Sequence, residues 1–263
     1  MRKVVYTALT NGYDHLTQIS CVKPGYDYIC FSNDFKESKI GMWTIRQIPC
    51  VVEDKQRLSR FPKLQPYRVL TEYDFSIYID ANVDIVTDVV YQSAERLYSE
   101  GVLLAGLKHQ LRNCAYRESF EVMVRGVEKN TKKVIEQMKK YVAEGFPFDY
   151  GMYEANVIYR RHNDPLVVKQ CDEWWFWQKN YSRRDQLSYS YSLWKNDLPF
   201  NYLLPPNEWA RNSLNLHCSR HPQNLPLVQK IWRHFKEQQL APVVSFFFFP
   251  LYKKYLMRSS TVG

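Results

Sequence analysis

Three oxygen-bearing side chains stand at every second position of "YIDANVDI" (residues 78–85): Asp80, Asn82 and Asp84. The run "YDFSIYI" before them predicts a buried strand. Carboxylate and amide oxygens beyond a strand end suit Mg²⁺ or Mn²⁺, and either ion can hold a diphosphate. A solvated turn is the alternative interpretation, because a single D-x-N pattern is common in turns.

Basic residues directly precede this strand. The segment "RLSRFPKLQPYRVL" (57–70) brings Arg60 and Lys63 close in sequence to Asp80. Guanidinium and ammonium groups hold phosphate oxygens, although a solvated basic helix face would have the same composition. We expect a short helix to start in "KLQPYRVL" (63–70), since Pro66 is tolerated only near a first turn.

Polar side chains also accompany the end of the first predicted strand. Thr7 lies in that strand, and Thr10, Asn11 and Asp14 lie in the loop that follows it. Ligands of open α/β sheets bind at the carboxyl ends of strands. A nucleotide base and ribose would therefore lie beside these residues, with ordinary loop polarity as the alternative.

Apolar runs alternate with helical patterns along the chain. Strands are predicted over 3–9, 26–32, 42–48, 75–80, 102–107 and 154–160. Helical patterns cover 88–101, 165–181, 183–195 and 224–238, with one long amphipathic segment over 117–144. This order predicts an α/β fold with a mostly parallel central sheet and helices on both faces.

The net charge of the chain limits the classes of binding partner that we expect. A net charge of +9 favours nucleic acid, an anionic membrane or a phosphate-bearing substrate. No zinc-finger spacing, basic arm or RNA-binding signature is present, so we expect no nucleic-acid partner. The cysteines form no C-x-x-C pair and the first strand begins without an apolar leader. We expect free thiols and a cytoplasmic location.

The segment "APVVSFFFFPLYKKYLMR" (241–258) differs from the rest of the chain. Its apolar run is too short to span a bilayer. Aromatic residues followed by Lys253, Lys254 and Arg258 predict an interfacial anchor on an anionic membrane; a tail folded back on the domain is the alternative. We expect one domain over 1–238 and a helical membrane-association tail over 239–263, on the inner face of the cytoplasmic membrane.

Several sequence blocks together resemble a known family. In order they are "YTALTNGYD", "YICFSND", "SRFPKLQPYRVLTEYDFSIYIDANVDI", "HQLRNCAYRE", "YEANVIYRRHN" and "SRRDQLSYSYSLWK". Over residues 1–235 the chain resembles the glycosyltransferase A (GT-A) fold. Within that fold it is similar to the glycosyltransferase-like family of plant pollen-tube and seed-mucilage proteins, which is related to retaining glycosyltransferase family eight.

The resemblance implies a Rossmann-like GT-A sheet and transfer of a sugar from a nucleotide sugar, expected to be a UDP-sugar. The expected acceptor is a glycan or a lipid-linked glycan. Asp80, Ala81 and Asn82 take the place of the D-x-D motif of this fold, with Mn²⁺ or Mg²⁺ as cofactor. Asn82 replaces the second carboxylate, so we expect weaker metal binding or metal-independent transfer. His217 would complete the site, with His221 as its rival.

The block Arg184–Asp185–Gln186 resembles the D-Q segment that lies beneath the reacting sugar in family eight. An oxygen at that place can stabilise oxocarbenium-like charge, so Asp185 and Gln186 are expected catalytic residues. The same letters fit a helix start with Ser182 as N-cap, and the two interpretations are compatible.

Two further pairs are candidates. Glu154 and Asn156 open a predicted strand, where Glu154 would act in catalysis and Asn156 would bind the donor; a strand-edge pair is the alternative. His109 and Arg112 follow the 102–107 strand and would bind donor or acceptor at the edge that carries Asp80, whereas a lone histidine is more often structural. Asp84 would support the metal site.

Three functions fit these residues. The first is a glycosyltransferase of hexosyl type in cell-surface polysaccharide or glycolipid synthesis, with a retaining mechanism. The second is a nucleotidyltransferase, although the loop after the first strand has one glycine, Gly12, instead of a glycine-rich phosphate loop. The third is a non-catalytic sugar-binding protein, for which Asn82 is the main support.

Overall fold

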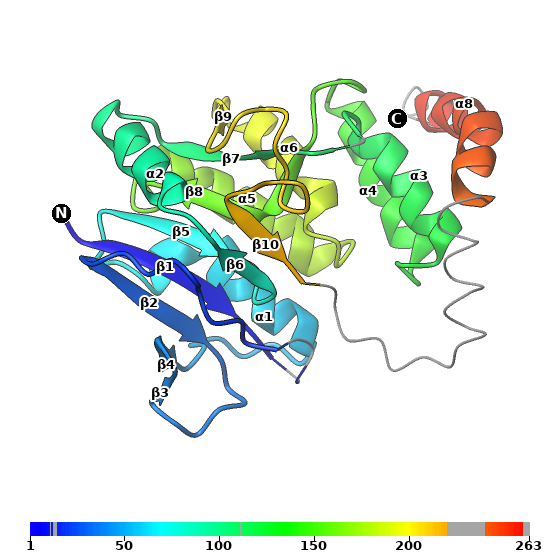
Figure 1. Cartoon of the computed structure of the whole chain (residues 1–263). Coiled ribbons are helices and arrows are strands. Elements are labelled where there is room, and N and C mark those ends of the chain that lie inside the picture. Colours follow the sequence, from blue (N-terminus) through cyan, green and yellow to red (C-terminus); the bar gives the residue numbers. More distant parts are fainter. Residues whose placement is uncertain (11, 13–14, 111, 220–239, 260–263) are drawn as a thin grey trace.

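The computed structural model describes residues 1–10, 12, 15–110, 112–219 and 240–259. An eight-stranded sheet lies at the centre of this described part (Figure 1), in the order β3-β4-β2-β1-β5-β8-β7-β9. The strands are β1 (Lys3–Ala8), β2 (Tyr26–Phe31), β3 (Lys39–Ile40), β4 (Trp43–Arg46), β5 (Phe75–Ile79), β7 (Leu104–Lys108), β8 (Tyr153–Arg160) and β9 (Asn201–Tyr202). Strands β4, β2, β1 and β5 run parallel, as do β7 and β9. Strand β8 is antiparallel to β5 and β7, and β3 to β4. The predicted α/β fold with a mostly parallel sheet is confirmed.

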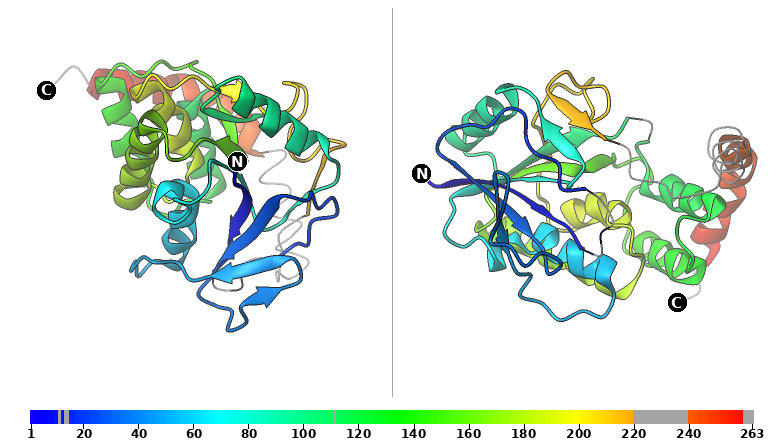
Figure 2. Two further views of the ribbon diagram at one scale, coloured as in Figure 1. Left: turned by 90° about the vertical axis from the view of Figure 1, so that its left-hand side faces the viewer. Right: turned by 60° about the horizontal axis from the view of Figure 1, so that its bottom comes forward.

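Helices cover both faces of the sheet because side chains alternate along each strand. In β1, Val5 packs in the core that contains α2 (Val89–Ser99). Val4 and Tyr6 pack in the opposite core with α1 (Lys55–Leu64), α5 (Pro165–Asn180) and α6 (Gln186–Lys195). Figure 2 shows the helices on either side of the strands. The predicted two-sided cover is therefore confirmed.

The first helix begins earlier than predicted. Its N-cap is Asp54, whose carboxylate accepts hydrogen bonds from the backbone N–H groups of Gln56 (3.0 Å) and Arg57 (3.3 Å). Pro62 lies inside α1, and a separate 3₁₀ turn, η1 (Pro66–Arg68), follows. The prediction of a start at residue 63 was wrong, because the cap at Asp54 sets the helix start.

A third group of helices extends from the carboxyl side of the sheet (Figure 1). The predicted 117–144 segment is two helices, α3 (Ala115–Arg125) and α4 (Thr131–Ala143). Gly126 ends α3 with a φ of 69°, a left-handed conformation that favours glycine. Asn130 caps α4 by accepting from Lys133 N at 3.1 Å. The single long helix was therefore a wrong prediction.

The tail forms α8 (Ala241–Ser259), which packs against this group through Phe249, Tyr252 and Leu256. The Tyr252 hydroxyl lies 3.2 Å from Ser119 Oγ of α3. The tail thus folds back on the domain, the alternative of the sequence analysis. None of the helices described here is long and apolar enough to cross a membrane. The helix predicted over 224–238 lies outside the described residues.

A small second sheet follows the central strand. Strand β6 (Val83–Ile85) pairs antiparallel with β10 (Leu216–Cys218), which places His217 opposite Asp84. Between β5 and β6 the chain turns, and Val83 N donates to Asp80 O at 2.9 Å. Because of this turn, Asp80, Asn82 and Asp84 do not lie on one continuous strand, so their alternation along the sequence does not place them on one face.

Candidate active site

Asp80 follows directly on β5, near the middle of the sheet. Its backbone N–H donates to the Asn156 carbonyl at 2.8 Å, which ties it to β8. Its Oδ1 accepts a 2.7 Å hydrogen bond from the Tyr78 hydroxyl. The side chain stays 28% exposed, so this carboxylate is held in place and still open to a ligand.

Helix α1 brings Lys63 to this carboxylate and Arg60 to the nearby Asp185. Arg60 and Lys63 are three residues apart and therefore share a face of the helix. Lys63 is only 1% exposed, and its Nζ lies 3.4 Å from Asp80 Oδ1 and 2.5 Å from Asp185 Oδ2. Arg60 Nε lies 3.5 Å from the same Asp185 oxygen. Lys63 thus joins two carboxylates from distant parts of the chain.

A buried arginine holds the last turn of α1. Arg160 of β8 is fully buried, and its Nη2 donates to the Lys63 carbonyl and to the Tyr6 hydroxyl, both at 2.6 Å. The last carbonyls of a helix lack partners within the helix, and a cation at that end is favourable. Arg160 therefore fixes the backbone that carries Lys63, and we assign it a positioning role.

Asp185 begins α6 and faces the cations of α1. It is the N-cap, with Oδ1 accepting from Gln186 N at 3.1 Å, and its carbonyl accepts from Trp174 Nε1 at 2.8 Å. Ser182 was a wrong prediction for the cap, because its hydroxyl bonds Glu128 at 3.1 Å. Burial alone would raise the pKa of Asp185, but Arg60 and Lys63 hold that pKa well below its usual range. Asp185 is ionised at neutral pH.

Glu154 and Asn156 lie side by side at the start of β8. Glu154 Oε2 accepts from Asn156 Nδ2 (3.2 Å) and from Ala210 N (3.0 Å), so it also fixes the loop before β10. Burial raises the pKa of Glu154, and the charge of Asp80 raises it further against the effect of Arg211. Asn156 Oδ1 is buried without a hydrogen-bond partner among the described atoms. Both side chains belong to the Asp80 edge.

Gln186 lies in the first turn of α6, next to Asp185. Its Nε2 contacts the Tyr153 carbonyl at 3.5 Å, which links α6 to the start of β8. The sequence analysis placed Asp185, Gln186 and Glu154 in one site, and the structure brings their backbones to one edge of the sheet.

His109 and Arg112 follow β7, which runs in the same direction as β5 because each is antiparallel to β8. Burial and the nearby Arg112 lower the pKa of His109 to about 4, so its ring is neutral at pH 7. Arg112 pairs with Glu118 at 2.6 Å and Glu121 at 3.1 Å. These two carboxylates balance its charge and attach the loop to α3, so Arg112 is not a simple phosphate-binding cation.

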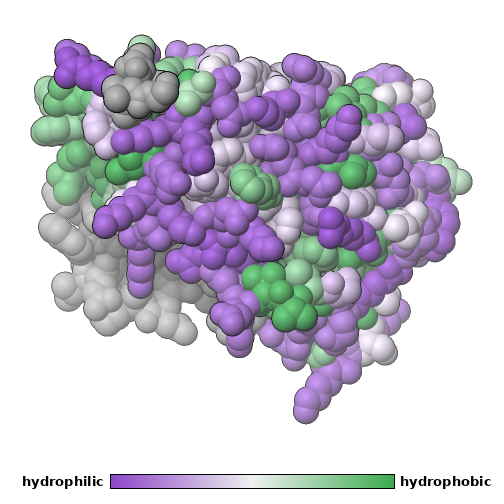
Figure 3. Space-filling model, turned by 180° about the vertical axis from the view of Figure 1, so that it is seen from behind, coloured by the Kyte–Doolittle hydropathy of each residue, from purple (hydrophilic) through white to green (hydrophobic). Residues whose placement is uncertain are grey.

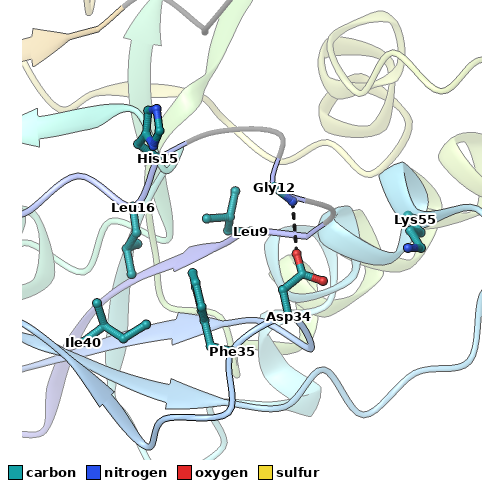
Figure 4. Close-up of a pocket in the computed structure, with 8 residues that line it drawn as sticks. All are labelled: Leu9, Gly12, His15, Leu16, Asp34, Phe35, Ile40 and Lys55. Atoms are coloured by element: carbon teal, nitrogen blue, oxygen red, sulfur yellow. Dashed lines mark hydrogen bonds between the residues drawn. The ribbon is translucent and has the colours of Figure 1, made fainter.

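A cavity of about 470 Å³ opens beside the ends of β1 and β2. Its lining residues are Leu9, Gly12, His15, Leu16, Asp34, Phe35, Ile40 and Lys55. Figure 4 shows apolar side chains around the opening and Asp34 accepting a 3.2 Å hydrogen bond from Gly12 N. An apolar pocket with a few polar groups is the usual form of a small-molecule site.

Only some of the residues that were predicted to bind the nucleotide lie near this cavity. Thr10 Oγ1 donates to the carbonyl of Lys55, one of the lining residues, at 2.8 Å. Thr7 Oγ1 is buried without a hydrogen-bond partner among the described atoms. Asn11 and Asp14 lie outside the described residues. Asp34 and Phe35 also line the cavity and were not predicted, although "YICFSNDF" places both directly after a predicted parallel strand.

The predicted metal ligands are arranged differently from the expectation. Asn82 Nδ2 donates to the Ser219 carbonyl at 2.7 Å, so only its Oδ1 is left as a ligand. His217 lies opposite Asp84 in the β6–β10 ladder, and directly opposed residues share a face. Asp84 itself accepts from Ser20 N (2.7 Å) and Ser20 Oγ (2.6 Å), so it has a structural role.

Among the described candidates, two side chains remain as ligands for a divalent ion. Asp80 and Asn82 fit as ligands, but His217 stands beside Asp84, and the rival His221 lies outside the described residues. The residues described here contain no group of three or more His, Cys, Asp or Glu side chains that could hold a metal ion. The described donor set therefore fits a weakly held, water-rich ion better than a closed metal site.

Comparison with known proteins gives one family. The TOD1/MUCI70 glycosyltransferase-like domain matches residues 28–217. Mouse xyloside xylosyltransferase 1 in its apo form shares 9% identity, with a TM-score of 0.45 over 76% of this chain and 84% of that chain. The bifunctional glycosyltransferase WbbM shares 10% identity, with a TM-score of 0.38 over 71% of this chain and 36% of that chain. No curated protein matches the sequence.

Proposed function

The chain belongs to the TOD1/MUCI70 glycosyltransferase-like family, and from this premise we propose that it transfers a sugar from a nucleotide-sugar donor to a glycan. One observation carries the proposal: Lys63 joins Asp80 and Asp185 at the carboxyl edge of the sheet. Two carboxylates that share Lys63, with Arg60 beside Asp185, suit a donor that separates into a diphosphate and a positively charged sugar.

The donor has two places to bind. The cavity at the ends of β1 and β2 is large enough for a base and ribose, with Phe35 as the aromatic surface. The diphosphate would extend from there to Asp80, Arg60 and Lys63. A UDP-sugar with a hexosyl group is the donor we propose, and a polysaccharide or glycolipid at the cell surface is the proposed final product.

Replacing Phe35 with alanine should weaken donor binding. Loss of the aromatic surface is expected to raise the KM for the donor about tenfold, with kcat little changed, because the ring touches no reacting atom. Steady-state kinetics over donor concentration measure this split. Phe176→Ala, at an exposed phenylalanine of α5, is the control. A Phe35 variant with an unchanged KM would place the base elsewhere.

The proposed reaction retains the anomeric configuration. The bond from the sugar C1 to the diphosphate breaks, and its electron pair leaves with the diphosphate, where Arg60 and Lys63 stabilise the charge. The acceptor hydroxyl forms the new bond to C1 from the same face, and its proton passes to a departing phosphate oxygen. Asp185, Gln186 and Glu154 would stabilise the positive charge on the sugar.

Asp80 and Asn82 would hold Mn²⁺ or Mg²⁺ through one oxygen each, and His217 would need to turn from Asp84 to take part. When bound, the ion would neutralise part of the diphosphate charge. Lys63 and Arg60 supply fixed positive charge at the same edge. We therefore propose that a metal assists transfer and that transfer without it is slower but measurable.

Replacing Asn82 with aspartate tests this arrangement. An aspartate cannot donate to the Ser219 carbonyl, and its oxygen would face that carbonyl, so without metal the variant should lose about 1–3 kcal/mol of stability. A bound Mn²⁺ would compensate the new charge. Thermal unfolding with EDTA and with Mn²⁺ measures both effects. If Mn²⁺ raises the Tm of Asn82→Asp by no more than it raises the Tm of the wild type, Asn82 is not a ligand.

The whole proposal is tested by incubating the purified protein with a panel of nucleotide sugars. Release of nucleoside diphosphate, with transfer to an added glycan, is the expected result. Release of pyrophosphate would favour a nucleotidyltransferase instead. Glycan binding in calorimetry without donor binding or turnover would favour a non-catalytic sugar-binding protein.

A further inference from the structure

Helix α8 has two apolar faces, and among the described residues only one of them is covered. Its buried stripe, which faces α3 and α4, consists of Ala241, Ser245, Phe249, Tyr252 and Leu256. The opposite side carries Val243, Phe246, Phe247 and Leu251, and we call these four residues the α8 outer face. Phe246 is 75% exposed, Phe247 65% and Leu251 63%. Hydrophobic residues gather over α8 at the upper left of Figure 3.

Positive charges border the α8 outer face. Lys254 and Arg258 lie three and seven residues beyond Leu251 and so continue the same side of the helix, and no acidic residue occurs in α8. Lys139 of α4 lies 4.5 Å from the Tyr255 ring centroid, which extends the basic surface to the neighbouring helix. Lys253 lies 4.4 Å from the Phe148 ring centroid, at the other border.

We propose that the α8 outer face binds the surface of an anionic lipid bilayer, with α8 lying in the plane of the interface. Aromatic and aliphatic side chains would enter the boundary of the acyl chains, and the lysines and arginine would contact the lipid headgroups. A second copy of the chain fits less well, because the same positive border would face itself.

The direction of the strands relates the α8 outer face to the Asp80 edge of the sheet. In Figure 1, β1 and β5 run from left to right, so their carboxyl ends point toward the side of the molecule where α8 lies. A bilayer on α8 would therefore be on the same side as the Asp80 edge. This step rests on the proposed function: the acceptor is then a glycan carried by a lipid in that bilayer. The enzyme would lie on the cytoplasmic side of the bilayer, and the six free cysteines are in keeping with that location.

Flotation of the full chain with liposomes tests the proposal. The wild type should float with vesicles of phosphatidylcholine and phosphatidylglycerol and much less with phosphatidylcholine alone. Phe246→Ser with Leu251→Ser should reduce binding about tenfold or more per lost apolar side chain. Lys254→Glu with Arg258→Glu should remove the preference for anionic lipid. Phe176→Ser, at a residue 50% exposed on α5, is the matched control and should float like the wild type.

Equal flotation of the wild type and the Phe246→Ser, Leu251→Ser variant would overturn the proposal. So would a wild-type dimer in light scattering that the same variant dissociates, because that result would assign the face to a second copy. Nucleotide release with a soluble acceptor should be unchanged in the α8 variants. Failure of the membrane proposal is thereby separated from failure of the proposed glycosyl transfer.

Discussion

Replacing Lys63 with methionine should destabilise the fold and stop transfer. Methionine keeps most of the apolar stem, but the buried carboxylate of Asp185 loses the ammonium group 2.5 Å away. Removing one partner of a buried ion pair costs about 3–5 kcal/mol. Removing a fixed charge that stabilises the departing phosphate lowers kcat about 100-fold or more. No other single substitution in the site is expected to act so strongly on both stability and turnover.

The loss of stability should depend on pH. The pKa of Asp185 in the folded wild type lies below its unfolded value of about 3.9. The ionised form of Asp185 therefore stabilises the fold fully above the unfolded-state pKa. This contribution disappears as the pH falls through the folded-state pKa. In the variant the buried carboxylate is neutralised at higher pH. The difference in stability between wild type and variant should be full at neutral pH and shrink toward pH 4.

Urea unfolding at neutral pH and at pH 4 measures this difference in stability between the wild type and Lys63→Met. Adding Asp185→Asn to Lys63→Met removes the unpaired charge and keeps the side-chain oxygen that caps α6, so it should restore part of the stability but not the turnover. Lys169→Met, at an exposed lysine of α5, should change neither. A loss below about 1 kcal/mol at neutral pH would show that the pair behaves like a solvent-exposed one.

The sequence predicted the sheet well because its strands are apolar runs that must be buried. The place of Asp80 follows from this, since a strand like "FSIYI" leaves only its end for polar residues. The start of α1 was misjudged because the prediction rested on Pro66, whereas the Asp54 N-cap sets the start of the helix. The true cap of α6 was missed because Ser182 has another use, a hydrogen bond to Glu128 from a distant segment.

The links within the site could not be predicted from spacing. Lys63 reaches Asp185 over 2.5 Å although α1 and α6 are far apart in the sequence. Arg160 is fully buried and donates to the Lys63 carbonyl. Nothing in the local sequence "YRRH" (159–162) distinguishes it from a basic residue at an ordinary strand end. The alternation that grouped Asp84 with Asp80 failed because a turn separates β5 from β6. Local patterns predict elements; such long-range contacts depend on how the elements pack.

Replacing Asp80 with asparagine should remove transfer and leave the fold intact. The amide oxygen can still accept from the Tyr78 hydroxyl and from Lys63, which contact Oδ1 at 2.7 and 3.4 Å. Only the charge is lost, so stability should change by less than about 1 kcal/mol. Turnover should fall about 100-fold or more, since this carboxylate would hold the divalent ion that neutralises part of the diphosphate charge.

Asp84→Asn is the matched control, four residues along the same chain segment. Its side chain is 9% exposed and contacts only Ser20 among the hydrogen bonds described. An asparagine there can accept from Ser20 N and donate to Ser20 Oγ, so fold and turnover should both survive. Donor-dependent nucleotide release and urea unfolding of both variants give the comparison. If the two variants lose activity equally, Asp80 has no role beyond shape, and the enzymatic proposal fails at the residue on which it depends most.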